Sequence, residues 1–282
     1  ISTVEDLAVV KRVIVENVAP HGTAVLNAND PMVIAMAEVC PGSVTFFSND
    51  SNNPVMTTHR AQGRRVVYLD GDVIVAAEGA QEIHLSLNDI PLTRNGTIHF
   101  QIENVMAAVA AAWALNLDWD VIRVGLRSFI SDATTVPGRF NVFDYRGATV
   151  IADYGHNPDA IVALVAAVNN MPAKRRMVVI SGAGDRRDED IRQQTQLLGA
   201  AFDEVILYQD QAQRGQADGE VIALLREGLK DASRTTAIQE INGEFLAIDT
   251  ALAKLDKDDL CLILVDQVEE ALAHIAMRIA ED

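Results

Sequence analysis

From residue 142 onward, short apolar runs alternate with longer amphipathic segments, and this rhythm limits the fold more than any other feature of the chain. The apolar runs predict strands at Val142–Tyr145, Thr149–Ala152, Arg176–Ser181, Glu204–Leu207, Thr236–Ile238 and Leu260–Leu264. The amphipathic segments predict helices near Pro158–Asn169, Ile191–Ala201, Gly219–Leu229, Glu244–Lys254 and Glu269–Arg278. Because parallel strands require such crossover helices, this order predicts a mostly parallel, doubly wound, Rossmann-like sheet.

The part of the chain before residue 130 is also α/β in character. A polar cap, an acidic first turn and helical apolar spacing predict a helix over residues 3–18. Further elements are predicted as strands at 23–26 and 43–47, a helix at 32–40, a strand hairpin within 64–92 and an alanine-rich helix at 102–117. Ser, Asp, Thr-Thr and Pro-Gly within 128–141 predict a linker. We therefore expect two α/β domains, 1–130 and 131–282.

The composition excludes some classes of protein. The formal net charge is −17, from 40 Asp and Glu against 23 Lys and Arg, so a nucleic-acid partner is not expected. Cys40 and Cys261 have the spacing of neither a zinc site nor a disulfide framework. With no visible signal peptide and no apolar run long enough to span a membrane, we expect a cytoplasmic protein without a membrane partner. The oligomeric state stays open, with a homo-oligomer among the alternatives. Because the chain opens at Ile1 without an initiator Met, we expect a fragment.

A polar segment, Asp153-Tyr154-Gly155-His156-Asn157-Pro158, directly follows one predicted strand. In open α/β sheets ligands bind at the carboxyl ends of strands, so this position suits a binding site. A carboxylate there can hold the hydroxyl groups of a ribose. The alternative is that Asp153 or Asn157 only caps the next helix.

Other charged, glycine-containing segments stand in comparable positions. Arg139 lies beside Gly138 in the linker and could bind a phosphate in a bidentate manner, or could simply be solvated. The segment Gly184-Asp185-Arg186-Arg187 follows a second strand and could bind an anion, or could be a solvated turn that begins a helix. Asp210 and Arg214 come after a third strand. We predict that Asp153, Asp185 and Asp210 lie on one edge of the sheet.

Together these motifs resemble the Mur ligase superfamily of ATP-dependent amide ligases. The six residues at 153–158 resemble the family's Asp-Tyr-Ala-His-Asn-Pro element. The resemblance extends to Pro-Gly-Arg-Phe-Asn at 137–141, Gly-Asp-Arg-Arg-Asp-Glu-Asp at 184–190 and Asp-x-x-x-Arg-Gly at 210–215. In the first part it rests on Thr-Val-Glu-Asp-Leu-Ala-x-x-Lys at 3–11, Val-Leu-Asn-Ala-Asn-Asp-Pro at 25–31 and Gln-x-Glu-Asn at 101–104. It implies the C-terminal half of a central, ATP-binding domain followed by a Rossmann-like C-terminal domain.

The resemblance also implies roles for individual residues. Lys11 matches a lysine that many Mur ligases carry in carbamylated form to help hold Mg²⁺. Asn104 matches an asparagine that contacts adenine, although the first asparagine of that family motif is Gln101 here. Arg139 matches the linker arginine that reaches the ATP phosphates, and Asp153 the aspartate that binds the ribose. The remaining candidates are Tyr154, His156 and Asn157 for the nucleotide and Gly184, Asp185, Arg186, Arg187, Asp210 and Arg214 for the amino-acid substrate.

The implied reaction uses ATP and Mg²⁺ to join arginine to aspartate side chains of an acidic polypeptide through an acyl phosphate. The alternatives are another Mur-type ligase, acting on a cell-wall precursor or on folylpolyglutamate, and a binding paralogue without catalysis. The 282 residues hold no Gly-x-x-Gly-Lys-Thr/Ser loop, which in this family cradles the phosphates. We therefore expect the chain by itself to be inactive.

Overall fold

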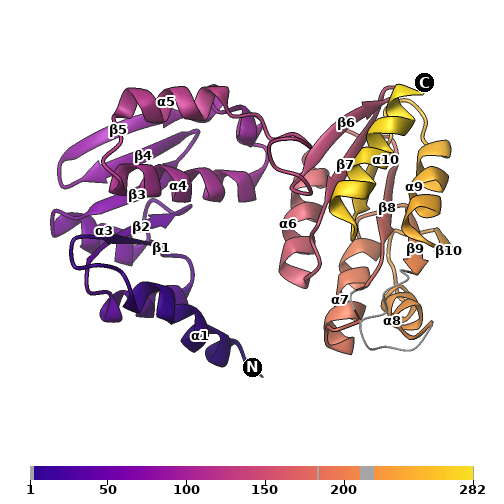
Figure 1. Ribbon diagram of the computed structural model, residues 1–282, viewed down its shortest axis with the longest axis horizontal. Coiled ribbons are helices and arrows are strands. Elements are labelled where there is room, and N and C mark those ends of the chain that lie inside the picture. The colour runs from indigo at the N-terminus through magenta and orange to yellow at the C-terminus, as the bar shows by residue number, and fades with distance from the viewer. Residues whose placement is uncertain (1–2, 183, 210–218, 282) are drawn as a thin grey trace. The chain divides into compact units, whose positions relative to one another are not determined.

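The computed structural model describes residues 3–182, 184–209 and 219–281 and divides the chain into two compact units. We call Ile1–Phe129 the N-terminal unit and Ile130–Asp282 the C-terminal unit, and describe each by itself. Both are mixed α/β structures, as Figure 1 shows, which confirms the predicted fold class. Among the helices described, none is both long and apolar enough to cross a membrane.

The N-terminal unit is built on a five-stranded sheet of order β1-β2-β3-β4-β5. Strands β1 to β3 run parallel, and β3, β4 and β5 are joined as antiparallel hairpins. The strands are β1 (Thr23–Asn27), β2 (Ser43–Ser48), β3 (Arg65–Asp70), β4 (Val73–Glu78) and β5 (Gln81–Ser86). The helices are α1 (Val4–Glu16), α2 (Pro31–Ala35), α3 (Pro54–Ala61), α4 (His99–Ala114) and α5 (Trp119–Ser128). Gly71 turns the β3–β4 hairpin with a φ of 61°, as its position in the sequence predicted.

Helix α4 covers one face of this sheet. Its side chains Ile102, Met106 and Val109 pack in one buried cluster with Val67 and Ile74 of the strands. The structure differs from the prediction in three elements. The helix predicted at 32–40 is α2 followed by a 3₁₀ turn (Met36–Val39), and the sequence interpretation assigned no element to α3 or α5.

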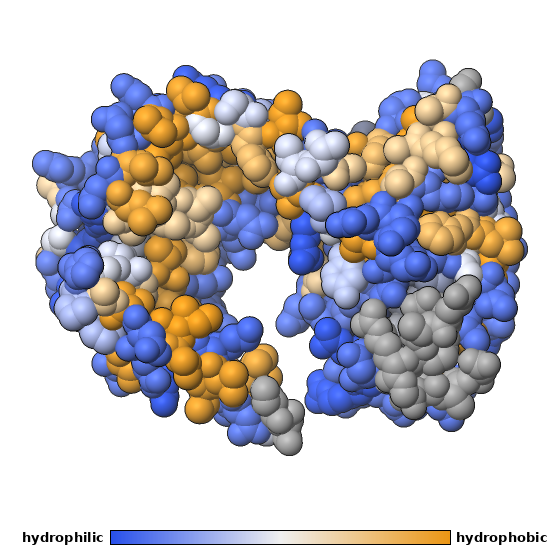
Figure 2. Space-filling model, in the orientation of Figure 1, coloured by the Kyte–Doolittle hydropathy of each residue, from blue (hydrophilic) through white to orange (hydrophobic). Residues whose placement is uncertain are grey.

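Helix α1 is well formed but poorly covered. Thr3 and Asp6 form a reciprocal capping box at its start, which fixes the first turn. Only Val15 of this helix is buried. The exposed large apolar side chains of α1 are Val4, Leu7, Val9, Val10, Val13 and Ile14. Figure 2 shows hydrophobic surface in the region of this helix.

The C-terminal unit is built on a six-stranded sheet of order β10-β9-β8-β11-β7-β6. All neighbouring strands are parallel except β6 and β7, which form an antiparallel hairpin. The strands are β6 (Asn141–Tyr145), β7 (Ala148–Asp153), β8 (Arg176–Ile180), β9 (Glu204–Gln209), β10 (Ala237–Asn242) and β11 (Leu260–Leu264). The helices are α6 (Pro158–Asn169), α7 (Asp188–Gly199), α8 (Glu220–Gly228), α9 (Glu244–Ala253) and α10 (Val268–Ala280). The sheet is mostly parallel with helices on both faces, as the sequence predicted.

The strand order creates a switch point at β11. Helices α9 and α10 share one core cluster with alternate strand residues such as Val150, Val179 and Ile263. Helices α6, α7 and α8 pack against one another, and the remaining strand residues point to the opposite face. The chain therefore leaves β11 toward one face and leaves its neighbours β7 and β8 toward the other. In open α/β sheets, ligands bind at the carboxyl ends of strands where the connections diverge in this way.

Candidate functional site

The turn before β6 holds Arg139 between two anchored residues. The Asn141 side chain is fully buried; its Oδ1 accepts a hydrogen bond of 2.7 Å from the Gly138 N–H, and its Nδ2 donates to the Val136 carbonyl at 2.9 Å. Gly138 and Phe140 both have positive φ, 70° and 51°. A Cβ at Gly138 would lie 2.7 Å from a side-chain methyl of Val268, so both the backbone angle and the space require glycine there.

Asp153 joins this turn to the carboxyl end of β7. Its side chain is only 8% exposed, and its Oδ2 accepts a hydrogen bond of 2.8 Å from the Phe140 N–H. Burial raises the pKa of Asp153, while hydrogen bonds from the backbones of Phe140 and Gly155 and the charge of Arg139 act in the opposite direction. The Tyr154 N–H also donates to the Gly138 carbonyl at 2.9 Å. The structure thus brings Asp153 and the exposed Arg139 together, with the guanidinium carbon 5.9 Å from the centre of the Tyr154 ring.

His156 lies beneath the same edge. Its Nδ1 donates to the Tyr154 carbonyl at 2.8 Å, because a carbonyl oxygen can only accept, and the centres of the two rings lie 4.5 Å apart at an interplanar angle of 40°. Its Nε2 points toward Asp266 Oδ1, 3.8 Å away. Asn157 is exposed and caps α6, its Oδ1 accepting from the Ala160 N–H at 2.8 Å. Asn157 therefore caps the helix, as the alternative interpretation of this segment predicted. The carboxylate of Asp153 instead accepts a hydrogen bond from the linker turn.

Two residues at this edge were not found in the sequence. Asp266 follows β11 and lies at the switch point, and the side chain of Glu244, at the start of α9, holds its backbone. Asp266 could have been found, because it follows an apolar strand in the same way as Asp153. Glu244 gives no such signal, since its role depends on where α9 lies against a loop that is distant in sequence.

The segment after β8 is exposed. Arg187 donates twice to Asp190, at 2.9 and 2.7 Å, and so forms an ion pair within the first turn of α7. This geometry agrees with the alternative of a solvated turn that begins a helix. Asp185 and Arg186 are exposed, and Gly184 is partly exposed. Because β7 and β8 run in the same direction, Asp153 and Asp185 follow strands that end at the same edge of the sheet. Asp210 and Arg214 lie outside the described residues.

The remaining candidates belong to the N-terminal unit. Lys11 is exposed on α1, and within the described part of the chain no three His, Cys, Asp or Glu side chains are placed to hold a metal ion. Asn104 is exposed on α4, and its Nδ2 donates to the buried Gln101 at 3.0 Å. The amide that replaces the family's first asparagine therefore orients the second one.

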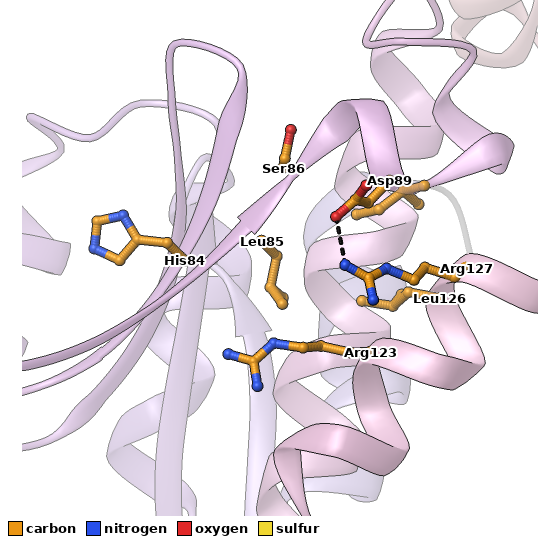
Figure 3. A pocket seen from close by; sticks show the side chains of 8 residues that line it. His84, Leu85, Ser86, Asp89, Arg123, Leu126 and Arg127 are labelled. Carbon is orange, nitrogen blue, oxygen red and sulfur yellow. Dashed lines mark hydrogen bonds and ion pairs between the residues drawn. The ribbon is translucent and has the colours of Figure 1, made fainter.

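A pocket lies elsewhere in the N-terminal unit, between β5 and α5 (Figure 3). Arg127 closes one side by an ion pair of 2.7 Å with Asp89. The lining residues are His84, Leu85, Ser86, Asp89, Ile90, Arg123, Leu126 and Arg127. None of the residues singled out in the sequence lines this pocket.

Comparison with known protein families covers both units. Residues 1–112 match the Mur ligase middle domain, and residues 138–264 match the Mur ligase glutamate ligase domain. The chain is 36% identical over 277 residues to the cyanophycin synthetase of Geminocystis herdmanii, which covers 98% of the chain and 32% of that protein. It is 36% identical over 280 residues to the cyanophycin synthetase of a Synechocystis species, at 99% and 32% coverage. The chain thus spans about a third of the length of these relatives, and the resemblance of its motifs to the Mur ligase superfamily is confirmed.

Solved structures show the same fold at lower identity. FolC of E. coli in complex with DHPP and ADP has a TM-score of 0.67 and 20% identity, covering 98% of this chain and 57% of that one. A pseudomurein peptide ligase type C from Methanothermus fervidus has a TM-score of 0.64 and 19% identity, at 98% and 60% coverage. With matches to both a middle and a C-terminal domain and with relatives along its whole length, the chain belongs to the Mur ligase family.

Proposed function

We propose that this chain is part of an ATP-dependent ligase that forms an amide bond through an acyl phosphate. The bond joins the α-amino group of arginine to aspartate side chains of cyanophycin, an acidic polypeptide. Two findings support this proposal: the 36% identity to cyanophycin synthetases and the anchored arginine at the sheet edge. The observation that carries it is the double anchorage of Arg139, whose neighbours are bonded to Asn141 and Asp153.

Positioning and charge stabilisation supply most of the catalysis in phosphoryl transfer. The γ-phosphoryl group passes to a carboxylate oxygen and ADP leaves; the amine then attacks the acyl carbon and inorganic phosphate leaves. A planar guanidinium suits the charge that develops on the phosphoryl oxygens, because it can donate two parallel hydrogen bonds. Arg139 is exposed while the backbone on both sides of it is fixed, so its head group can move without loss of the turn.

The proposal assigns the nucleotide to Asn104, Arg139, Asp153, Tyr154, His156 and Asn157. The Oδ1 atom of Asp153 is the oxygen that does not accept from Phe140, and we assign the ribose to it. Mg²⁺ fits less well. Lys11 is an exposed side chain, and the residues that the structure describes do not group three acidic, His or Cys ligands. We therefore assign no step to a metal held by these residues.

The test uses the natural protein with ATP, arginine and an acidic polypeptide, and follows ADP release and amide formation. Arg139→Ala is expected to lower kcat/KM by at least about tenfold, since a charge-assisted hydrogen bond contributes about 1.5–3 kcal/mol. Thermal stability should be unchanged, because the side chain is exposed.

The matched control is Arg146→Ala. Arg146 is also an exposed arginine over a tyrosine ring, 5.0 Å from the centre of Tyr145, but it lies in the β6–β7 hairpin at the opposite end of β7. Equal kinetics for the two variants would remove Arg139 from the site. Amide formation with another amino acid but not with arginine would favour a different Mur-type ligase. We also propose that residues 1–282 alone release no ADP, and measurable turnover by them would contradict this.

A further inference from the structure

The loop between β11 and α10 occupies the switch point of the C-terminal sheet. It contains Asp266, whose side chain is 13% exposed and faces His156 Nε2 at 3.8 Å. Strand β11 lies directly beside β7, which ends in Asp153. The loop therefore adds a carboxylate to the edge where the proposed nucleotide residues Tyr154 and His156 lie.

A buried glutamate from another helix fixes this loop. Glu244, the first residue of α9, is 3% exposed. Its Oε1 accepts from the Asp266 N–H at 2.8 Å, and its Oε2 accepts from the Gln267 N–H at 3.2 Å and from Gln267 Nε2 at 3.3 Å. Burial of a carboxylate is costly unless hydrogen bonds compensate, and these three donors compensate it. The loop conformation thus depends on the charge of Glu244.

The competing explanation is that Glu244 only stabilises the start of helix α10. Gln267 is the N-cap residue of α10 but its side chain makes no capping hydrogen bond to the helix, and an anion near a helix N-terminus is favourable. That explanation accounts for the contacts to Gln267. It does not account for the shortest contact, which goes to the backbone of Asp266, one residue before the cap. That contact fixes the backbone of Asp266, the residue whose side chain faces His156.

We propose that Glu244 is a positioning residue, which holds Asp266 against His156 so that Asp266 receives a positively charged group of the amino-acid substrate. The inference rests on the proposed function. Its chemistry follows from Asp266 itself, which places a largely buried carboxylate beside the carboxyl end of β7, where a negative charge attracts a cationic ligand. Arginine, with its guanidinium and α-amino groups, has the required charge.

The kinetic test compares Glu244→Gln with the wild-type natural protein. A glutamine keeps the volume but turns an N–H₂ donor toward the loop donors, so the loop should loosen. The KM for arginine is expected to rise about tenfold, while the KM for ATP changes by less than about threefold. Asp266→Asn removes the charge without disturbing Glu244 and should raise the arginine KM at least as much. Unchanged arginine KM values, or equal rises in both KM values, would overturn the proposal.

The matched control is Glu204→Gln. Glu204 is also a buried glutamate of this unit, but it pairs with Lys254 and Arg175 at the amino end of β9, the opposite edge of the sheet. This variant should lose stability and keep both KM values. A rise in its arginine KM equal to that of Glu244→Gln would show that any loss of stability has this effect, and would overturn the proposal.

Amide hydrogen exchange in the 282-residue chain separates this inference from the proposed function. Glu244→Gln should accelerate exchange at the amides of Asp266 and Gln267 relative to the amides of β11, and Glu204→Gln should not. Uniform acceleration would overturn the positioning role. If the wild-type protein forms no amide with arginine, the proposed function fails, while the exchange result still decides whether Glu244 holds the loop.

Discussion

The two units cover their apolar surfaces in different ways. In the C-terminal unit the exposed large apolar side chains of its regular elements are dispersed, one each on α6, β10, α9 and α10: Val162, Ile238, Leu246 and Met277. In the N-terminal unit, six such side chains lie on α1 alone. Contiguous exposed apolar surface of this kind marks a contact surface or a tendency to aggregate, whereas scattered apolar side chains are normal.

The two sheets also differ in the character of their edge strands. Strand β1 forms one edge of the N-terminal sheet; it is parallel and largely apolar, and it follows the poorly covered α1 in the chain. The edge strand β10 of the C-terminal unit carries the polar residues Gln239, Glu240 and Asn242, and the other edge strand, β6, is half of the β6–β7 hairpin. Exposed apolar edges invite pairing with other chains, and charged edges oppose it. Of the two units, the C-terminal unit therefore exposes less apolar surface that another chain would have to cover.

Separate expression tests this contrast directly and should give the largest effect. Residues 130–282 are expected to unfold in one cooperative transition and to elute as a compact species, because their core is covered on both faces of the sheet. Residues 1–129 are expected to aggregate or to bind a hydrophobic dye. Thermal unfolding and size-exclusion chromatography measure both outcomes. A molten C-terminal piece, or a well-behaved N-terminal piece, would contradict the comparison.

Two helical isoleucines sharpen the contrast at the level of single residues. Ile275 of α10 is 0% exposed and Ile14 of α1 is 72% exposed. Ile275→Ala should lower the unfolding free energy of the C-terminal unit by about 2–5 kcal/mol, because it leaves a cavity in a packed core. Ile14→Ala should change stability by less than about 0.5 kcal/mol. Chemical denaturation of the 282-residue chain measures both, and similar losses would show that α1 is packed after all.

Much of the fold could be predicted from the sequence. The strands of the C-terminal unit were placed within a few residues, because apolar runs separated by helix-length amphipathic segments determine a parallel sheet. Helix α5 has no counterpart in the sequence prediction, which assigns no element between the alanine-rich helix and the linker, although the segment is amphipathic and Asp118 caps its start. Helix α3 is short and owes its start to Asn53, which caps it, and to Pro54.

The candidate site was less predictable. Asp153 and Arg139 could be found because each lies in a local motif, and the structure brings them together. The contact between Glu244 and Asp266 depends on the order of strands in space. Strand β11 is inserted between β7 and β8, although it follows both in sequence by many residues. Local sequence patterns do not reveal such an insertion. Nothing in the sequence therefore indicates that Glu244 and Asp266 lie close together.

Lowering the pH should give the smallest effect, and it should change the stability of the two units differently. His59 in the N-terminal unit is buried, stacks edge-on against Phe46 and hydrogen-bonds the Val44 carbonyl at 2.8 Å. Burial lowers the pKa of His59 below its ordinary value of 6.5, although the Val44 hydrogen bond opposes this. The unfolded state therefore binds the proton first, and stability should fall as the pH drops below about 6.5.

In the C-terminal unit the corresponding groups are acids, whose contribution to stability is also lost as the pH falls, but in a lower pH range. The Arg234 hydrogen bond lowers the pKa of Asp203, and the Arg278 hydrogen bond lowers the pKa of Asp249. Their contribution is present above the ordinary value of 3.8 and is lost only as the pH falls below it. At pH 5 the N-terminal unit should therefore lose stability while these acids still support the C-terminal unit. Unit-resolved hydrogen exchange between pH 7 and 5 measures the difference. His59→Gln keeps a donor for Val44 but does not titrate, so it should remove most of the pH dependence of the N-terminal unit; an unchanged dependence would assign the effect to other groups.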